Sequence, residues 1–209
     1  RDSEQPGLKK ILRRIWLTWV YRHISKAFYV GTNNKAYFKA HGLKEEQLVF
    51  FPHAVDNERF FDSEEKQYEK KARQKRKELG YRETDIVVLF AGKLEAKKNP
   101  LILLEAVCQF NQIEWELSNS TTQHLNKSTP QQINKSTNKQ LNLLFVGNGP
   151  LETELKIKSQ ELSYVKFLPF QNQSDMPVVY RLGNVFCLPS KGPGETWGLA
   201  VNEALACGR

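Results

Sequence analysis

Between residue 86 and the C-terminal end, short apolar segments alternate with segments long enough to form helices. The first apolar segment, residues 86–91, is β-branched and continuous, as expected for a strand buried on both faces of a sheet. Strands are predicted at residues 86–91, 142–146, 165–168 and 185–188, and helices at residues 100–110, 151–162, 174–182 and from residue 198 onward. This alternation predicts an α/β fold with a doubly wound parallel sheet.

The N-terminal part also contains strand and helix signals. Residues 8–24 have apolar side chains at three- and four-residue spacing, with Lys and Arg mostly on the other side of the helix. Strands at residues 27–31 and 48–52 flank a short helix at residues 35–41. The favoured interpretation of Leu8–Ile24 is a helix that packs its apolar stripe on a domain core. The alternative is a basic helix that lies on an anionic membrane surface.

A highly charged stretch, residues 62–82, separates these two parts. Its mixture of Lys, Arg and Glu predicts an exposed helix that ends at Gly80. We therefore expect one domain over residues 1–60 and a second over residues 61–209. The formal net charge of +8 favours anionic partners, among them phosphorylated ligands, anionic membranes and nucleic acid.

Residues 118–140 interrupt the strand–helix pattern. They are rich in Asn, Gln, Ser, Thr and Lys, and the sequence at residues 126–129 recurs at residues 134–137. Such a segment buries too little apolar surface to order itself, so we expect a disordered surface insertion without a catalytic role.

The loops after the predicted strands are rich in glycine and lysine. Ligands bind beyond the carboxyl ends of parallel strands, and glycine lets the backbone approach them closely. The first loop carries Gly92, Lys93 and Lys98, and the second carries Gly147. Neither the dinucleotide fingerprint nor the Gly-Lys-Ser/Thr phosphate loop occurs, which argues against NAD enzymes and nucleoside triphosphatases.

The segment of residues 192–203 is the most specific chemical signal. A glycine-rich loop with Glu195 leads through Gly198 into a predicted helix that carries Glu203. The free backbone amides of a helix N-terminus bind anions. A neighbouring carboxylate accepts hydrogen bonds from hydroxyl groups, so phosphate and sugar recognition in one loop indicates a nucleotide-sugar pocket.

These segments resemble the group 1 (family 4) glycosyltransferases. The similarity rests on residues 90–94 and 98–100, on residues 145–150 and on residues 195–203, and reaches back to residues 51–56. It implies a retaining enzyme of the GT-B fold, with two Rossmann-like domains that face a cleft. Residues 1–60 would be the C-terminal part of the acceptor-side domain and residues 61–209 the donor-binding domain, both incomplete in this chain.

The resemblance also implies roles for individual residues. Lys93 and Lys98 would neutralise the donor diphosphate. Glu195 would contact hydroxyls of the transferred sugar near the reacting carbon, and Glu203 would bind the ribose. The remaining expected contacts come from loop and helix-start residues: Gly92, Gly147, Gly194, Thr196, Trp197, Gly198 and Leu199.

The implied activity is transfer of a sugar, with retention, from a UDP-, GDP- or ADP-linked donor to a hydroxyl of a carbohydrate or lipid-linked acceptor. No cofactor and no metal site are expected. The predicted location is the cytoplasm. An additional interpretation is a peripheral position at the inner face of the membrane, with contact through Leu8–Ile24. Two alternatives stay open: a non-catalytic nucleotide-sugar-binding module or inactive fragment, and a basic nucleic-acid-binding protein, which we disfavour.

Two further residue types bear on the site. The three cysteines, Cys108, Cys187 and Cys207, are widely spaced in apolar contexts and are expected to be reduced core residues. His53 follows a predicted strand near the domain exit, where we expect a structural or cleft-lining role.

Overall fold

The computed structural model describes residues 7–125, 140–191 and 198–209. The chain divides into two compact units, Arg1–Ala54 and Val55–Arg209, and each is described by itself. This division into compact units falls after Ala54, and the sequence predicts a domain boundary after residue 60. Phe60 is 2% exposed and packs in the core of the second unit. Its carbonyl oxygen accepts a hydrogen bond from Arg181 Nη2 at 2.8 Å.

The first unit contains two short parallel strands and two α-helices among its described residues. Its elements are α1 (Gly7–Tyr21), β1 (Ala27–Tyr29), α2 (Thr32–Ala40), the 3-10 helix η2 (Glu45–Gln47) and β2 (Leu48–Phe50). Ala27 lies opposite Leu48 in the parallel pair. His41 is buried beside the Tyr21 and Tyr37 rings, and its Nδ1 lies 2.8 Å from the Tyr37 carbonyl oxygen.

Helix α1 packs on this unit through the side that carries Thr18 and Tyr21. The Tyr21 ring meets the Phe38 ring with their centroids 5.7 Å apart. The predicted apolar stripe instead faces outward, since the side chains of Ile15, Trp16 and Trp19 are 63%, 60% and 59% exposed. The favoured expectation, that this stripe packs on a domain core, is therefore not met within the described unit.

The second unit is built on a four-stranded parallel sheet with the order β5-β4-β3-β6. The strands are β3 (Ile86–Ala91), β4 (Leu141–Val146), β5 (Val165–Leu168) and β6 (Val185–Phe186). The helices are α3 (Asn57–Phe60), α4 (Tyr68–Glu78), η3 (Ala96–Lys98), α5 (Pro100–Leu125), α6 (Glu152–Lys158), α7 (Met176–Tyr180) and α8 (Leu199–Ala206). The predicted parallel sheet is thus confirmed, with element ends that differ by a few residues.

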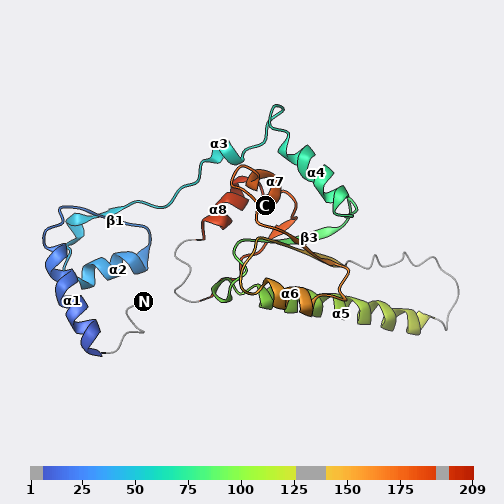
Figure 1. Cartoon of the computed structure of the whole chain (residues 1–209), viewed down its shortest axis with the longest axis horizontal. Helices are drawn as coiled ribbons and strands as arrows, with labels where there is room; N and C mark the ends of the chain where they lie inside the picture. The colour runs from blue at the N-terminus through green and yellow to red at the C-terminus, as the bar shows by residue number, and fades with distance from the viewer. Residues whose placement is uncertain (1–6, 126–139, 192–197) are drawn as a thin grey trace. The chain divides into compact units, whose positions relative to one another are not determined.

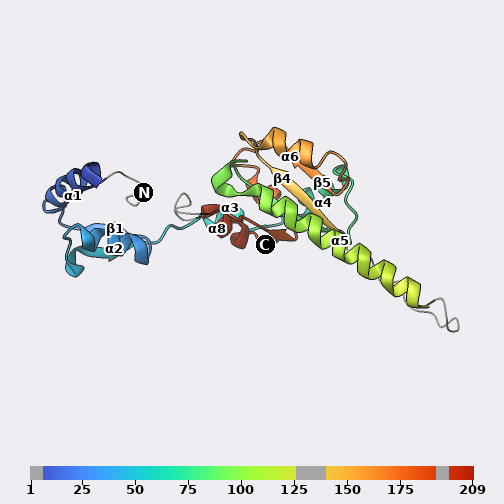
Figure 2. The same cartoon turned by 90° about the horizontal axis from the view of Figure 1, so that it is seen from below.

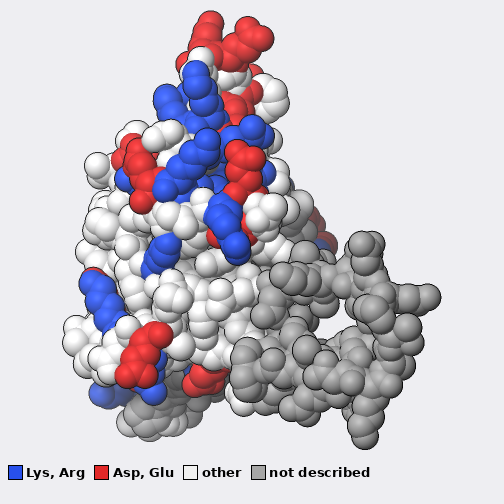
Figure 3. Space-filling model, turned by 90° about the vertical axis from the view of Figure 1, so that its right-hand side faces the viewer, with Lys and Arg blue, Asp and Glu red and all other residues white. Residues whose placement is uncertain are grey.

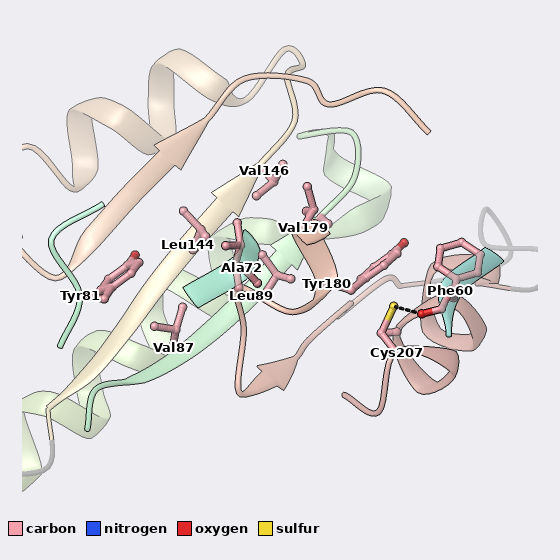
Figure 4. Packing of buried hydrophobic residues seen from close by; sticks show 13 residues of the cluster. Phe60, Ala72, Tyr81, Val87, Leu89, Leu144, Val146, Val179, Tyr180 and Cys207 are labelled. Carbon is pink, nitrogen blue, oxygen red and sulfur yellow. Dashed lines mark hydrogen bonds between the residues drawn. The ribbon is translucent and has the colours of Figure 1, made fainter. Parts of the chain in front are cut away.

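Alternate side chains of the strands pack on opposite faces of this sheet. Val87, Leu89 and Ala91 belong to the core cluster that contains residues of α4, α7 and α8. Val88 and Phe90 belong to the second cluster, which contains residues of α5 and α6. The sheet therefore lies between two helical layers, with α7 and α8 on one side and α5 and α6 on the other (Figure 1). Figure 4 shows the buried residues of the first cluster, from Phe60 to Cys207.

Helix α5 is longer than predicted. The sequence predicts an end at residue 110, but the helix continues to Leu125 and extends well past the sheet (Figure 2). Residues 118–125, for which the sequence predicts a disordered insertion, are therefore helical. Adding residues to an existing helix costs little, and Asn, Ser and Thr disfavour a helix by only a few tenths of a kcal/mol, roughly, per residue. The remainder of the predicted insertion up to residue 139 lies outside the described residues.

Helix α4 lies within the charged stretch and carries six basic residues from Lys70 to Lys77. Figure 3 shows Lys and Arg mixed with Asp and Glu over this helix. Its N-terminus is fixed by Asp62, whose two carboxylate oxygens accept hydrogen bonds from the amides of Tyr68 at 2.7 Å and Glu69 at 3.0 Å. Near its C-terminus, Arg76 Nη1 donates to the Leu182 carbonyl at 2.6 Å. Charge in this stretch therefore also holds the second unit together.

The three cysteines are free thiols, as expected. Cys207 is buried and Cys108 and Cys187 are partly buried, and burial raises the pKa of both Cys187 and Cys207. Across the described residues, no helix combines the length and apolar character that crossing a bilayer requires.

Candidate donor-binding site

The direction of the chain through the sheet changes beside β3. From β3 the sheet grows through β4 to β5 on one side, and then β6 is added on the other side. In open parallel sheets, ligands bind beyond the carboxyl ends of the strands at such a switch point. The loops after β3 and β6 flank this point, and both belong to the segments singled out in the sequence.

The loops after β3 and β4 form one closely packed backbone layer. The Leu94 amide donates to the Asn148 carbonyl at 2.8 Å, and the Leu151 amide donates to the Leu94 carbonyl at 3.0 Å. Gly147 and Gly149 have φ angles of +132° and +155°. A Cβ at either position would lie within 2.4 Å of a carbonyl oxygen of the β3 loop, so the contact requires glycine. Gly92 and Gly147 thus shape the site through their backbone.

The predicted lysines lie in the loop after β3. Lys93 is exposed, and its Nζ lies 3.8 Å from Glu95 Oε2, while Lys97 Nζ lies 3.3 Å from Glu95 Oε1. Lys98 is half-buried at the end of η3. The Lys97 carbonyl accepts a hydrogen bond at 2.9 Å from the Lys191 amide, which joins the loops after β3 and β6. The lysines are therefore placed at the switch point.

Helix α8 begins beside the end of the β6 loop. Its N-cap residue Gly198 is buried and left-handed, with a φ of +71°, and no side chain among the described residues caps the helix. The amides at this helix start, including that of Leu199, are suited to an anion. Four predicted contacts, Gly194, Glu195, Thr196 and Trp197, lie outside the described residues.

Glu203 is not a plain surface residue of α8. Its Oε2 accepts a 2.6 Å hydrogen bond from the Tyr180 hydroxyl on α7, and its Oε1 accepts a 3.0 Å hydrogen bond from Gln173 Nε2. Burial raises the pKa of Tyr180, and the hydrogen bond to the carboxylate raises it further. Tyr180 therefore stays protonated and acts as the donor over the physiological pH range.

Tyr180 and Gln173 were not predicted from the sequence. Gln173 lies in the loop after β5, so its position at a strand carboxyl end was an available signal. Tyr180 gave none, because a tyrosine in a helix of apolar neighbours is typical of a core residue.

The remaining candidates are His53, a metal-binding cluster and a cavity of the second unit. His53 is exposed and belongs to the first unit. Within the described ranges, no group of three or more His, Cys, Asp or Glu residues has the arrangement needed to hold a metal ion. A cavity of about 320 Å³ is lined by Arg76, Tyr81 and Asn184, near the residues that precede β3 and β6. It therefore lies at the amino ends of the strands, away from the candidate site.

Sequence comparison agrees with the resemblance drawn from the motifs. The profile of the family described as "Glycosyl transferases group 1" matches residues 71–209. The D-inositol 3-phosphate glycosyltransferase of Salinispora arenicola is 28% identical over 142 residues, which cover 64% of this chain and 27% of that protein. The protein of the same name from Salinispora tropica is also 28% identical, with 25% of its length covered.

Solved structures share the fold. Anabaena Alr3699/HepE, solved in complex with UDP, matches 99% of this chain with a TM-score of 0.67 and 19% identity. WaaG, a glycosyltransferase involved in lipopolysaccharide biosynthesis, matches 99% of the chain with a TM-score of 0.60 and 17% identity. The match covers 49% of HepE and 50% of WaaG, so this chain spans about half their length. These similarities confirm the predicted α/β architecture of the GT-B type.

Proposed function

The chain belongs to the group 1 glycosyl transferases, and we propose from this premise that it forms the donor-binding part of an enzyme that transfers a sugar from a nucleotide diphospho-sugar to an acceptor hydroxyl. The second unit would bind the donor, and the first would belong to the acceptor-side domain. One observation carries the proposal. The lysine-rich loop after β3 and the loop that leads to α8 are hydrogen-bonded to each other at the switch point of the sheet.

The diphosphate would bind beside the β3 loop and the start of α8. Lys93 and Lys98 would offset its charge, and the helix amides from Gly198 onward would donate to its oxygens. Neutralising the diphosphate stabilises the nucleotide as a leaving group, so these groups act on the bond that breaks. The HepE structures contain UDP and UDP-glucose, which supports a nucleoside diphosphate as the ligand of this fold.

The carboxylates of Glu195 and Glu203 would bind the hydroxyl groups of the donor. Glu203 would accept hydrogen bonds from the ribose, and Glu195 would contact the transferred sugar near its reacting carbon. We propose that transfer proceeds with retention, and that rate enhancement comes from diphosphate stabilisation and donor positioning more than from a strong nucleophile. The acceptor class, carbohydrate or lipid-linked, is left open by this proposal.

A binding titration and a transfer assay test the proposal together. The chain should bind UDP, GDP or ADP, and Lys93→Met should weaken that binding. In the complete protein, Glu195→Ala should remove most sugar transfer while the fold is retained. Binding without transfer by the complete wild-type protein would favour a non-catalytic nucleotide-sugar-binding module. Absence of nucleotide binding would contradict the proposal altogether.

A further inference from the structure

The carboxylate of Glu203 is held from two different elements. Tyr180 on α7 donates its hydroxyl to Oε2 at 2.6 Å, and Gln173 in the loop between β5 and α7 donates its side-chain amide to Oε1 at 3.0 Å. Each oxygen therefore has one donor among the described residues. A carboxylate side chain on a helix would otherwise rotate among several staggered conformations. Here two hydrogen bonds fix the plane of the carboxylate.

The hydrogen-bonding capacity that remains has a specific pattern. An ionised carboxylate offers about four acceptor positions, two on each oxygen. Tyr180 and Gln173 use one position on each oxygen, and with respect to the described residues this leaves one acceptor position on Oε1 and one on Oε2. Two neighbouring acceptors at a fixed spacing suit two hydroxyls on adjacent carbon atoms. The ribose of a nucleotide carries such a pair at its 2′ and 3′ positions.

The two donors are themselves anchored to different degrees. Tyr180 is 1% exposed, and its ring lies against the rings of Phe60 and Phe186, with centroids 6.2 and 5.4 Å away. In Figure 4 its hydroxyl points out of the sheet core, on the side of Phe60. Gln173 is exposed, but its backbone carbonyl accepts a hydrogen bond from Arg59 on α3. Helix α3 therefore supports both residues that hold Glu203.

We propose that Tyr180 and Gln173 are positioning residues that orient Glu203 toward the 2′- and 3′-hydroxyls of the nucleotide ribose. This inference rests on the proposed donor-binding function and identifies what sets its preference for ribonucleotides. A site built to accept hydrogen bonds from a hydroxyl discriminates against a ligand that lacks it. The discrimination depends on how tightly the acceptor is held, since a carboxylate free to rotate can turn to water instead.

The test compares UDP with 2′-deoxy-UDP, or GDP or ADP with its deoxy form if that nucleotide binds more tightly. The ratio of the two dissociation constants is measured for wild type, Tyr180→Phe, Gln173→Leu and Glu203→Gln. Wild type should favour the ribonucleotide about tenfold, as expected for one hydrogen bond to a charged group. Tyr180→Phe should lower this preference to about twofold, and Glu203→Gln should do the same.

Tyr81→Phe is the matched control. Tyr81 is also a buried tyrosine of the same core cluster, but its hydroxyl has no hydrogen-bond partner among the described residues. This variant should keep the wild-type preference. The ratio separates positioning from general loss of structure, because damage to the fold weakens both nucleotides alike. If Tyr180→Phe does not fold, the exposed Gln173→Leu provides the same comparison.

The possible outcomes separate the two proposals. A loss of preference in Glu203→Gln, with the preference retained in folded Tyr180→Phe and Gln173→Leu, overturns the positioning roles and leaves the proposed function standing. If the wild type binds UDP but shows no preference for it over 2′-deoxy-UDP, the ribose role of Glu203 is overturned. The positioning roles of Tyr180 and Gln173 are then overturned as well. No nucleotide binding by wild type overturns the proposed function, and the inference falls with it.

Discussion

Gly147 lies so close to the backbone of Gly92 that a Cβ at position 147 would be 2.1 Å from the Gly92 carbonyl oxygen. The two residues directly follow the neighbouring strands β4 and β3, so this contact brings two loops of the candidate site together. No side chain can rotate to relieve the overlap, because the atoms that the added Cβ would meet are backbone atoms of Gly92.

Gly147→Ala should therefore destabilise the second unit by at least about 2 kcal/mol, from the collision and the positive φ together. Gly208→Ala is the control, since Gly208 has a φ of +73° but no atom within 4 Å of its added Cβ. It should cost about 1 kcal/mol, the left-handed backbone alone. Urea unfolding of both variants measures the difference. Equal losses would show that the β3 and β4 loops can move apart.

The sheet of the second unit was predictable because its strands are continuous apolar segments. Residues 86–91 form β3 with the predicted ends, and β5 also matches at residues 165–168. The loops with Lys93 and Gly147 were placed correctly as a consequence, since strand ends determine where they emerge. The order of the strands did not follow from the pattern, because pairing depends on contacts between segments far apart in the chain.

Contacts between side chains of distant segments could not be predicted from the sequence either. The place of Phe60 in the core of the second unit did not follow from the sequence, because nothing local marks it as a core residue. The roles of Tyr180 and Gln173 depend on Glu203, which is 23 and 30 residues away. The end of α5 was missed for a different reason. Polar composition predicts disorder, but a helix that is already formed extends through polar residues at small cost.

Glu95 holds both Lys93 and Lys97 by ion pairs in the loop after β3. If these lysines bind a diphosphate, the Glu95 carboxylate competes with it for them. Glu95→Gln should therefore strengthen UDP binding about threefold at low salt, in line with the small free energy of exposed ion pairs. The gain should shrink at 0.5 M salt, where charges are screened.

The control for this change is Glu78→Gln on α4. Glu78 also pairs with a lysine, with 3.2 Å between its Oε2 and Lys75 Nζ, but it does not lie in the β3 loop. The Glu78→Gln substitution should leave the affinity for UDP unchanged. Equal effects of the two variants, measured by calorimetric titration, would place the diphosphate away from the β3 loop.

Asp62 caps α4 by accepting hydrogen bonds from the amides of Tyr68 and Glu69. Burial alone would raise the pKa of Asp62, but the hydrogen bonds from the amides of Glu69, Tyr68 and Ser63 outweigh it, and the pKa is lowered. A lowered folded-state pKa stabilises the protein above the unfolded value of about 3.9, and the effect is lost as pH falls through the folded value.

Asp62→Ala should consequently cost about 1–2 kcal/mol at pH 7, as for other side chains that accept hydrogen bonds from the first amides of a helix. At pH 2 to 3 the difference between wild type and variant should narrow, because wild type also loses its charged cap there. Denaturant unfolding at both pH values measures this. A difference that stays constant would mean that the neutral carboxyl caps the helix as well as the carboxylate does.

For Tyr81 we expect the opposite pH dependence of stability, which falls as the pH becomes alkaline. Burial raises the pKa of Tyr81. The positive charge of the Arg76 guanidinium lowers the pKa by a smaller amount, so the net change is upward. The folded protein then keeps this proton at a pH where the unfolded chain, with a tyrosine pKa of about 10, releases it. More protons bound in the folded state mean that stability falls as pH rises above about 10.

Tyr81→Phe removes this contribution, and at pH 8 it should leave the free energy of unfolding unchanged or raise it by up to about 1 kcal/mol, since the hydroxyl has no partner among the described residues. Between pH 8 and pH 11, wild type should lose about 1 kcal/mol more than the variant. Urea unfolding at both pH values measures these changes in the free energy of unfolding. The contribution of the titrating lysines cancels in the comparison, because both proteins carry the same lysines. An equal loss in the two proteins would show that the Tyr81 hydroxyl ionises in the folded state as readily as in the unfolded chain.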